Sequence, residues 1–358
     1  IIGLANTGKT TIFNCMSNTK AESSAYAFSA TKSNKGIIEV PDPRLYKIDE
    51  LIHSAKVVPA TVEIVDVPGL AKGSSQGEGV GNKFLADIQQ TDALIHVLRC
   101  FDDESLPHIE GSVDPVRDID IVDFELQVRD LDLVNRKIER TQKQANVGDA
   151  KAKKELQILE TYKNHLENFG NARSAPVDDH NRYVIHDLLL LTDKPVIYVC
   201  NVDDASAITG NDYVDRVKEH LQDEEVDIIV VAGELEAEIA ELDEADRPDF
   251  LADAGLKEPG VDKLIRAAYH TLNLQSFFTA GPKEVKAWTI HKGMTAPQAS
   301  GVIHSDLERG FIRAEVMKYE DFISLGSEQA VKNTGKFHVE GKNYVVEDGD
   351  IMHIRFNV

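Results

Sequence analysis

Nine residues at the start of the chain, 3–11, have the types and the spacing that bind phosphate. Their sequence, GLANTGKTT, fits G-x-x-x-x-G-K-[ST], a glycine-rich turn between a strand and a helix. In such a turn the backbone N–H groups point toward phosphates, Lys9 adds positive charge beside the β- and γ-phosphates, and the Thr10 hydroxyl can bind Mg²⁺. The motif predicts a site for a nucleoside triphosphate and Mg²⁺, with Lys9 as a catalytic residue.

A second motif, Asp66-Val67-Pro68-Gly69, ends an apolar run and fits D-x-x-G. In P-loop switch proteins the aspartate of this motif reaches Mg²⁺, usually through water, and the glycine amide meets the γ-phosphate. Thr31 lies between the two motifs in a polar segment of suitable length for a switch loop. We therefore expect Thr10, Thr31 and Asp66 at the metal, and Gly69 at the γ-phosphate.

The residue after this motif is Leu70, at a position where many GTPases have a glutamine that orients the attacking water. A leucine side chain cannot hydrogen-bond to water. The sequence therefore predicts either very slow turnover or a polar group that comes from another part of the chain.

The element that reads the base is expected after the apolar run that ends at Cys200, where the sequence is Asn201-Val202-Asp203-Asp204. Guanine-specific proteins of this class use N-K-x-D, in which the lysine stacks along the base and the aspartate accepts hydrogen bonds from guanine. Val202 replaces the lysine, so half of the guanine signature is absent. Asp204 keeps the fourth position and could still select guanine, so ATP and GTP both stay open.

Short apolar runs alternate with helical patterns over much of the chain. Runs such as 196–200 are apolar throughout, which is typical of parallel strands that helices cover on both faces, and they predict a doubly wound, mostly parallel α/β sheet. Such a sheet binds ligands at the carboxyl ends of its strands. The predicted strands are residues 61–67, 93–100, 195–201 and 226–232.

The strand pattern is interrupted between residues 121 and 191, where apolar residues recur at spacings of three and four. This spacing predicts two long antiparallel helices joined near residues 146–149, which form an inserted helical hairpin, or arm. After residue 276 half-buried strands are predicted at 285–290, 310–316 and 344–346, in a small mixed sheet. The predicted domains are therefore a nucleotide-binding domain (1–120 and 192–275), a helical arm (121–191) and a C-terminal domain (276–358).

Composition and charge limit the class of partner. The chain has 358 residues and a formal net charge of −22, which argues against nucleic-acid binding over the whole surface. A local basic cluster in the predicted arm is still compatible with RNA, although a solvated helical face is the more common meaning of such a run. The cluster consists of Arg136, Lys137, Arg140, Lys143, Lys151, Lys153, Lys154 and Lys163.

Two further features concern the environment of the protein. No apolar run approaches the length needed to cross a bilayer, so we expect no membrane partner. The three cysteines are far apart and lack metal-ligand spacing, which fits a reducing compartment. We therefore expect a cytoplasmic protein, and we expect it to be a monomer.

Taken with five further segments, these motifs make essentially the whole chain resemble the YchF/Obg-like ATPase family. The segments are PDPRL (41–45), GSVDP (111–115), FTAGP (278–282), AWTI (287–290) and APQA (296–299). The resemblance implies a P-loop domain of the translation-factor GTPase class, an inserted helical arm and a C-terminal ubiquitin-like TGS domain. It also implies dependence on Mg²⁺, acceptance of ATP in preference to GTP, and association with the ribosome.

The resemblance also implies roles for single residues, by matching position. The residues that would hold the phosphates are Asn6, Thr7, Gly8, Lys9, Thr10 and Thr11. Asn201 and Val202 would contact adenine. Members of the family have a hydrophobic residue at the position of Leu70 and a histidine in the loop that corresponds to residues 106–110, so His108 is the candidate for positioning or activating the water.

The chain departs from the family pattern at two places. The family usually has Pro-Asn-Val before Gly-Lys-Ser, whereas this chain has Ala5-Asn6-Thr7 and then Thr10, which keeps the magnesium-binding hydroxyl. The fourth residue of the base motif is commonly glutamate, and here it is the shorter Asp204. The second departure affects the choice between ATP and GTP.

Two classes of function fit these features. The first is a slow, Mg²⁺-dependent hydrolase of ATP, or of GTP if Asp204 selects guanine, that acts as a molecular switch. The second is a ribosome- or RNA-binding module in which the nucleotide is mainly a conformational ligand and the arm and TGS domain make the contacts. A small-molecule kinase fits less well, because the predicted arm lacks an obvious catalytic arginine pair and an acceptor-binding lid.

Overall fold

The computed structural model describes residues 1–17, 33–69, 80–243 and 245–357 of the chain. The chain divides into two compact units. The N-terminal unit consists of residues 1–36 and 64–264, and the C-terminal unit consists of residues 37–63 and 265–358. In the described parts of both units, no helix is long and apolar enough to cross a membrane.

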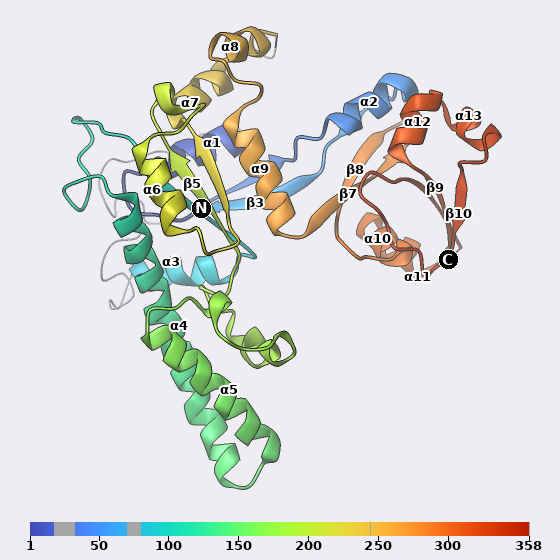
Figure 1. The fold of residues 1–358 in the computed structure, drawn as a ribbon. Coiled ribbons are helices and arrows are strands. Elements are labelled where there is room, and N and C mark those ends of the chain that lie inside the picture. The colour runs from blue at the N-terminus through green and yellow to red at the C-terminus, as the bar shows by residue number, and fades with distance from the viewer. Residues whose placement is uncertain (18–32, 70–79, 244, 358) are drawn as a thin grey trace. The chain divides into compact units, whose positions relative to one another are not determined.

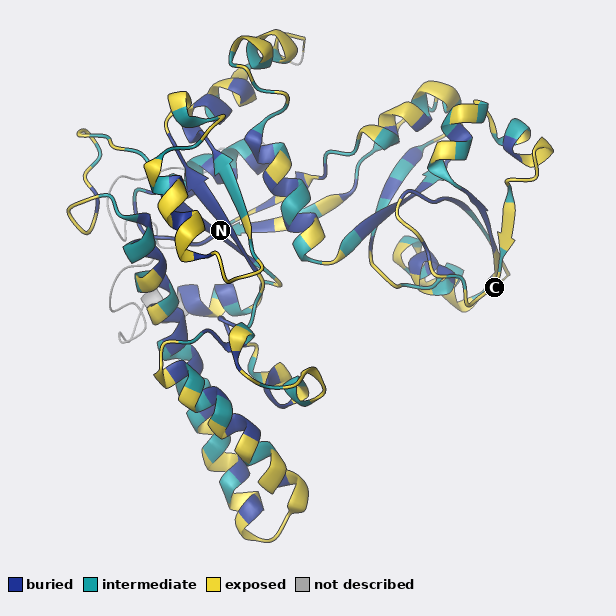
Figure 2. Ribbon diagram, viewed as in Figure 1, coloured by how far each residue is buried: buried dark blue, intermediate teal, exposed yellow. Residues whose placement is uncertain are grey.

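A parallel sheet forms the centre of the N-terminal unit (Figure 1). Its strands in spatial order are β4 (Leu94–Arg99), β5 (Val196–Asn201) and β6 (Asp227–Val231). The register pairs His96 with Tyr198, and Tyr198 with Ile228. Every residue of β4 and β5 is buried (Figure 2), so parallel strands covered on both faces are confirmed at 93–100 and 195–201, whereas in β6 only Val231 is buried.

The first residues of the chain extend this sheet. Ile2 forms a parallel bridge with His96, and its N–H donates to the carbonyl of Ile95 at 2.8 Å. The N–H of Val67 donates to the carbonyl of Ile1 at 3.1 Å. The segment before the glycine-rich turn therefore lies between β4 and β3 (Thr61–Asp66), which in turn pairs with β1 (Asn34–Glu39).

Helices pack on the sheet of the N-terminal unit. One buried cluster joins the strands to α3 through Phe84, to the first turns of α4 through Val122 and to α6 through Val217. The helices of this unit other than the arm include α1 (Lys9–Ser17), α3 (Val80–Gln89), α6 (Asp212–His220), α7 (Gly233–Glu241), α8 (Arg247–Asp253) and the short 3₁₀ helix η3 (Asp204–Ser206), and α9 (Gly260–Thr271) begins here and continues into the C-terminal unit.

Two long helices, α4 (Pro115–Asn146) and α5 (Ala150–Glu167), lie side by side and project away from the sheet (Figure 1). They pack through a buried cluster that includes Val134, Leu159 and Tyr162. Helix α4 begins at Pro115, earlier than residue 121, because Asp114 caps it and proline favours the first helical position. The first turns of α4 therefore belong to the core of the sheet, and its distal part pairs with α5.

The middle of α4 is hydrogen-bonded to the segment that leads from α5 back to the sheet. This segment contains the 3₁₀ helices η1 (Ala172–Ser174) and η2 (Asp179–Leu188). The buried carboxylate of Asp130 accepts hydrogen bonds from the N–H of Leu191, the N–H of Thr192 and the hydroxyl of Thr192, each at 2.7 Å. Burial raises the pKa of Asp130 to about 6, and the three hydrogen bonds oppose that change.

A mixed six-stranded sheet forms the C-terminal unit, in the order β10-β9-β11-β7-β8-β2. Strands β11 and β7 are parallel, as are β2 and β8, and the other neighbours are antiparallel. The strands are β2 (Val57–Val58), β7 (Leu274–Ala280), β8 (Val285–His291), β9 (Phe311–Met317), β10 (His338–Glu340) and β11 (Ile351–Phe356). The helices are α2 (Pro43–Ile52), α10 (Ala296–Ile303), α11 (Ser305–Arg309), α12 (Tyr319–Leu325) and α13 (Glu328–Asn333).

Residues 37–63 group with the C-terminal unit, whereas the sequence placed them within 1–120. Strand β2 pairs with β8, with Val57 opposite Val285. Arg44 donates to the carboxylates of Asp42 and Asp348, at 2.8 Å in each ion pair, and its guanidinium lies 5.4 Å from the centre of the Phe278 ring. These contacts join the PDPRL segment to the FTAGP segment, which lie far apart in the sequence.

The prediction of a strand at residues 344–346 was wrong. In the structure Val345 forms only an isolated bridge with Thr295, and the last strand is β11. The reason is a turn held by Asp350, whose Oδ2 accepts from the Tyr344 hydroxyl at 2.6 Å and from the N–H of Glu347 at 2.9 Å. These hydrogen bonds hold residues 344–347 in a turn, so the segment does not pair with a neighbouring strand over several residues.

Candidate nucleotide-binding site

The glycine-rich turn lies at the carboxyl end of the sheet and leads into α1, which begins at Lys9. Asn6 and Gly8 have positive φ angles of 63° and 89°. A Cβ on Gly8 would lie 2.2 Å from Nδ2 of Asn201, and a Cβ on Gly3 would lie 2.5 Å from the carbonyl oxygen of Val97. Only glycine fits at these two positions, because the turn passes directly over the ends of β4 and β5.

Lys9 is buried inside the curve of the turn, where its ammonium donates to the carbonyl of Leu4. Burial lowers the pKa of Lys9 to about 8, and the negative charge of Asp66 opposes this change. A cation in a buried place is weakly screened by water, so its field acts strongly on nearby groups. The ammonium can therefore attract phosphate oxygens that the turn encloses.

Thr10 and Asp66 are joined across the site. The Thr10 hydroxyl donates to Oδ2 of Asp66 at 2.9 Å, and Nδ2 of Asn34 lies 3.5 Å from the same oxygen. The other carboxylate oxygen of Asp66, Oδ1, is buried and has no hydrogen-bond partner among the described residues. A buried carboxylate oxygen without a partner is costly, and Mg²⁺ is commonly held by one or two protein oxygens together with phosphates and water. The pair of Thr10 and Asp66 therefore fits Mg²⁺.

The D-x-x-G segment passes against the turn. A Cβ on Gly69 would lie 2.9 Å from the backbone N of Ala5, so this glycine is also set by a close approach of two backbones. The predicted metal ligand Thr31 lies outside the described residues, as does Leu70.

The side chain of Asn201 supports the glycine-rich turn. Its Nδ2 donates to the carbonyl of Thr7 at 3.0 Å, and its Oδ1 accepts from the N–H of Gly233 at 2.9 Å. Asn201 is the last residue of β5, and Gly233 is the first residue of α7. The amide thus connects the phosphate-binding turn to the turn after β6, and both of its ends are engaged with the backbone.

Two other residues of the base motif, Val202 and Asp204, differ in exposure. Val202 is buried in the cluster under the sheet, and its N–H donates to the carbonyl of Val231 at 2.9 Å. Asp204 is exposed at the start of η3, and Asp203 caps that helix by accepting from the N–H of Ser206 at 3.0 Å. Of the two side chains, only Asp204 is open to a ligand in this structure.

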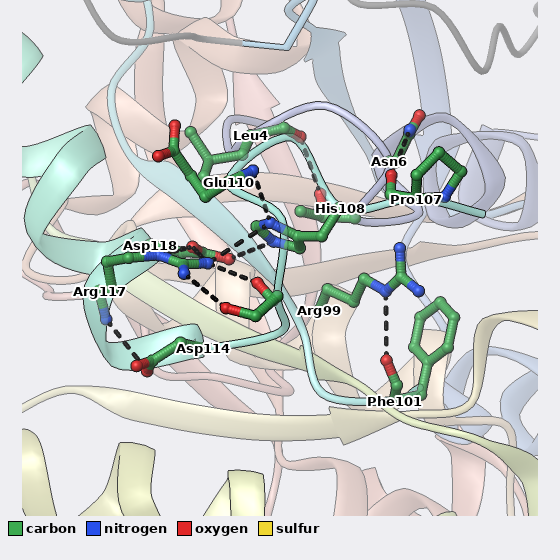
Figure 3. Close-up of polar contacts among 12 residues, drawn as sticks. Leu4, Asn6, Arg99, Phe101, Pro107, His108, Glu110, Asp114, Arg117 and Asp118 are labelled. Carbon is green, nitrogen blue, oxygen red and sulfur yellow. Dashed lines mark hydrogen bonds and ion pairs between the residues drawn. The ribbon is translucent and has the colours of Figure 1, made fainter. Parts of the chain in front are cut away.

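His108 lies in the loop between β4 and α4 and is buried (Figure 3). The N–H of Glu110 donates to its Nδ1 at 3.1 Å, and its Nε2 lies 2.8 Å from Oδ2 of Asp118. Because Nδ1 accepts a hydrogen bond, the ring proton lies on Nε2 and donates to Asp118. Arg117 pairs with Oδ1 of the same carboxylate at 2.9 Å. Burial raises the pKa of Asp118, and Arg117 and His108 oppose that change.

The His108 loop touches the phosphate-binding turn. Nδ2 of Asn6 donates to the carbonyl of Pro107 at 3.2 Å (Figure 3). The structure therefore brings residues 6–11, Asp66, Gly69 and Asn201 together around one turn and attaches His108 to it through the preceding residue.

Two family models match the chain. The first is described as a 50S ribosome-binding GTPase and matches residues 1–131. The second is YchF-GTPase_C, described as a protein of unknown function, and it matches residues 274–357. A protein named Ribosome-binding ATPase YchF from Haemophilus ducreyi is 47% identical over 358 residues, which cover 100% of this chain and 98% of the relative. The chain belongs to the YchF family.

Other relatives extend the similarity. The Ribosome-binding ATPase YchF of Bacillus subtilis is 45% identical, and Obg-like ATPase 1 of Pongo abelii is 40% identical over 100% of this chain and 91% of its own length. The solved structure of the Schizosaccharomyces pombe YchF GTPase matches with a TM-score of 0.86 at 33% identity, over 99% of this chain and 96% of that one. The P-loop GTPase fold predicted from the motifs is therefore confirmed.

In this member of the YchF family, sequence reasoning missed two residues of the site. Gly233 binds the amide of Asn201, and Arg99 binds the backbone of the loop before His108. The signal for Arg99 was a charged residue near the end of a mostly apolar run, 93–100. The signal for Gly233 was its place directly after a predicted strand, at the edge of the sheet where ligands bind.

Proposed function

We propose that this chain is a Mg²⁺-dependent hydrolase of nucleoside triphosphates, with ATP favoured over GTP, and that it acts as a slow molecular switch on the ribosome. The observation that carries the proposal is the 2.9 Å hydrogen bond from Thr10 to Asp66, which joins the P-loop hydroxyl to the D-x-x-G carboxylate. The names of the relatives from Haemophilus ducreyi and Bacillus subtilis, both Ribosome-binding ATPase YchF, support the nucleotide and the partner.

Each group has a role in this proposal. Thr10 and Asp66 would hold Mg²⁺, with Thr31 as a further ligand, and the ion would supply positive charge beside the phosphates. Lys9 and the N–H groups of residues 6–11 bind phosphate oxygens and stabilise the negative charge that spreads over them in the transition state. The N–H of Gly69 binds the γ-phosphate, so the backbone at this glycine responds to whether the γ-phosphate is present.

We assign the positioning of the attacking water to His108, because the leucine side chain of Leu70 cannot hydrogen-bond to it. The imidazole uses Nε2 to donate to Asp118, so Nδ1 is the atom that can accept from water once it releases the N–H of Glu110. The carboxylate of Asp118 accepts from Nε2 and so orients the ring, as in other pairs of histidine and aspartate.

Adenine is favoured because Val202 replaces the lysine that stacks on guanine. Asn201, at the end of β5, supports the proposed base site by bracing the P-loop against Gly233. GTP is the alternative substrate, because Asp204 is exposed and keeps the position that reads guanine. Competition of ATP and GTP for the same chain, with Asp204→Glu as the comparison, distinguishes the two. A GTP affinity above the ATP affinity would overturn the preference for ATP.

We further propose that residues 121–191 are an arm and residues 276–358 a TGS domain, and that both contact the ribosome in the cytoplasm, with the chain as a monomer. Arg136, Lys137 and Lys151 form ion pairs with Asp132, Asp187 and Glu155, so the positive charge available to RNA is that of the other exposed basic residues at the far end of the arm. These residues are Arg140, Lys143, Lys153 and Lys154. They favour phosphate contacts, which give salt-dependent binding.

The hydrolase is tested by Lys9→Ala, with the exposed Lys218→Ala as a control. We expect phosphate release from ATP and Mg²⁺ to fall to background in Lys9→Ala and to stay at the wild-type rate in Lys218→Ala. A wild-type rate in Lys9→Ala would show that this turn does not perform the hydrolysis. Ribosome binding without any turnover by the wild type would favour the second candidate, an RNA-binding module for which the nucleotide is a conformational ligand.

A further inference from the structure

Arg99, the last residue of β4, is buried and reaches into the loop that follows the strand. Its side chain is 1% exposed. Nε donates to the carbonyl of Phe101 at 3.2 Å, Nη1 to that of Leu106 at 2.7 Å and Nη2 to that of Asp103 at 3.2 Å. The guanidinium lies 4.8 Å from the centre of the Phe101 ring (Figure 3). All three nitrogens of one side chain therefore bind the backbone of residues 101–106.

Backbone carbonyl oxygens stabilise the positive charge of Arg99. Within the described parts of the chain, no carboxylate forms an ion pair with it, and the carbonyl oxygens take that place. Burial lowers the pKa of Arg99, while the negative charges of Asp103, Asp102 and Asp118 oppose this change. Burying a guanidinium without hydrogen bonds is expensive, so the loop conformation that supplies three carbonyls is strongly preferred over others.

The loop held by Arg99 ends in three consecutive residues that contact three different elements. The carbonyl of Leu106 accepts from Arg99 at the end of β4. The carbonyl of Pro107 accepts from Asn6 of the P-loop at 3.2 Å. The ring of His108 binds Asp118 on α4 at 2.8 Å. A shift of Leu106 therefore moves both the contact with the P-loop and the imidazole, because no residue separates them.

We propose that Arg99 is a positioning residue for ATP hydrolysis, which sets the place of Pro107 and His108 against the P-loop by holding the backbone before them. This inference rests on the proposed function of His108. The guanidinium is suited to this task because its planar fork binds several carbonyls at once, whereas a lysine ammonium would hold fewer of them in fixed directions. Arg99 acts through the loop, because its three nitrogens are taken up by backbone carbonyls.

The test compares Arg99→Met and Arg99→Lys in the full chain with Arg247→Met, a control arginine whose Nε binds one backbone carbonyl, that of Leu242, at 3.2 Å. We expect kcat for ATP to fall about tenfold or more in Arg99→Met, because small misplacements of a catalytic group have effects of this size. We expect KM to change less than about threefold, Arg99→Lys to fall between Arg99→Met and the wild type, and Arg247→Met to keep the wild-type kcat.

A double variant separates positioning from general loss of structure. If Arg99 acts through His108, then Arg99→Met combined with His108→Ala has the same kcat as His108→Ala alone, when rates are normalised to nucleotide-binding sites. Losses that multiply in the double variant would overturn the inference, since they would show independent action. If Arg99→Met fails to fold, as judged by thermal unfolding, Arg99→Lys replaces it in the same cycle.

The outcomes also separate this inference from the proposed function on which it rests. A wild-type kcat in the folded Arg99 variant together with a low kcat in His108→Ala overturns the role of Arg99 only. A wild-type kcat in His108→Ala overturns both the water-positioning role of His108 and the inference. In either case the loss of turnover in Lys9→Ala still tests the hydrolase itself.

Discussion

Nε2 of His108 lies 2.8 Å from Oδ2 of Asp118, which is in the first turn of α4. The hydrogen bond joins the loop that contacts the P-loop to the long helix that carries the arm. Both side chains are buried, with 2% and 1% of their side-chain surface exposed, so water competes little for this contact. The nucleotide site and the arm are therefore connected through one pair of side chains within the N-terminal unit.

We predict that Asp118→Asn lowers kcat for ATP by about tenfold and leaves ATP affinity within about threefold of the wild type. The amide oxygen can still accept from Nε2, but a weaker neutral hydrogen bond replaces the charge-assisted one that orients the ring. Steady-state hydrolysis and equilibrium binding of a fluorescent ATP analogue measure the two effects. Asp132→Asn, on the exposed side of the same helix, is the control and should match the wild type. A loss of affinity as large as the loss of kcat would contradict this role.

Asn201→Ala should weaken ATP binding by about tenfold or more, because the N–H of Gly233 and the carbonyl of Thr7 lose their shared partner. The same titration with a fluorescent ATP analogue measures the change. The control is Asn211→Ala, which removes a different amide that binds the carbonyl of Cys100 at 2.8 Å. The control should keep its ATP affinity, and equal losses in both variants would show that Asn201 has no special place at the P-loop.

Exchange of two exposed arm lysines, Lys153→Gln with Lys154→Gln, should weaken ribosome binding and leave ATP hydrolysis unchanged. The slope of log affinity against log salt should become shallower by about 1 to 2, since each phosphate contact contributes about 0.7 to 0.9. Co-sedimentation with ribosomes at several salt concentrations measures both quantities. The matched control, Lys218→Gln with Lys257→Gln, removes the same charge from exposed sites outside the arm. If the two pairs of changes had equal effects, the arm would not be the docking surface.

Arg44→Met should destabilise the segment 37–63 within the C-terminal unit by about 1–2 kcal/mol, because Asp42 and Asp348 lose their common partner. Hydrogen exchange at the N–H groups of α2 and β2 in the full chain measures this loss. Arg309→Met is the control, because Arg309 is 72% exposed and pairs with one surface carboxylate, Asp306. Its effect should stay below about 0.5 kcal/mol. Unchanged protection of the α2 N–H groups from exchange in Arg44→Met would show that the ion pairs of Arg44 do not stabilise this segment.

The stability of the arm base should depend on pH through Asp130. Its pKa in the folded chain is about 6, against an ordinary value of 3.8, so between these values the native state holds a proton that the unfolded state has lost. The contribution of Asp130 to stability therefore falls as pH rises from about 4 to 6, by at most about 3 kcal/mol. Thermal unfolding at pH 4, 5, 6 and 7 should show the wild type losing stability relative to Asp130→Asn. A constant difference between the two would contradict the raised pKa, and the exposed Asp179→Asn should show no such trend.

Motifs and periodicity predicted the elements that local sequence controls. The runs 93–100, 195–201 and 226–232 are strands β4, β5 and β6, because parallel strands that helices cover are made mostly of apolar residues. The run 344–346 was not a strand, because the hydrogen bonds of Asp350 decide its path. Apolar composition alone does not distinguish these cases.

Contacts between distant parts of the chain decided the rest. Residues 37–63 lie between the two phosphate motifs in the sequence, yet they fold with residues 265–358 because β2 pairs with β8 and Arg44 binds Asp348. Likewise, the role of Asn201 as a brace depends on Thr7, which is 194 residues away. No local pattern carries such information.

The sequence by itself determined the family, the P-loop fold and the residue types at the phosphates, since these follow from short motifs and from periodicity within single elements. The assignments of single residues to Mg²⁺, base and water stay predictions. Only the tertiary structure decided that Asp66 meets Thr10, that both ring nitrogens of His108 are bound and that Arg99 holds the loop before it. The physical reason is that buried polar groups must find partners, and the fold determines which distant groups are within reach.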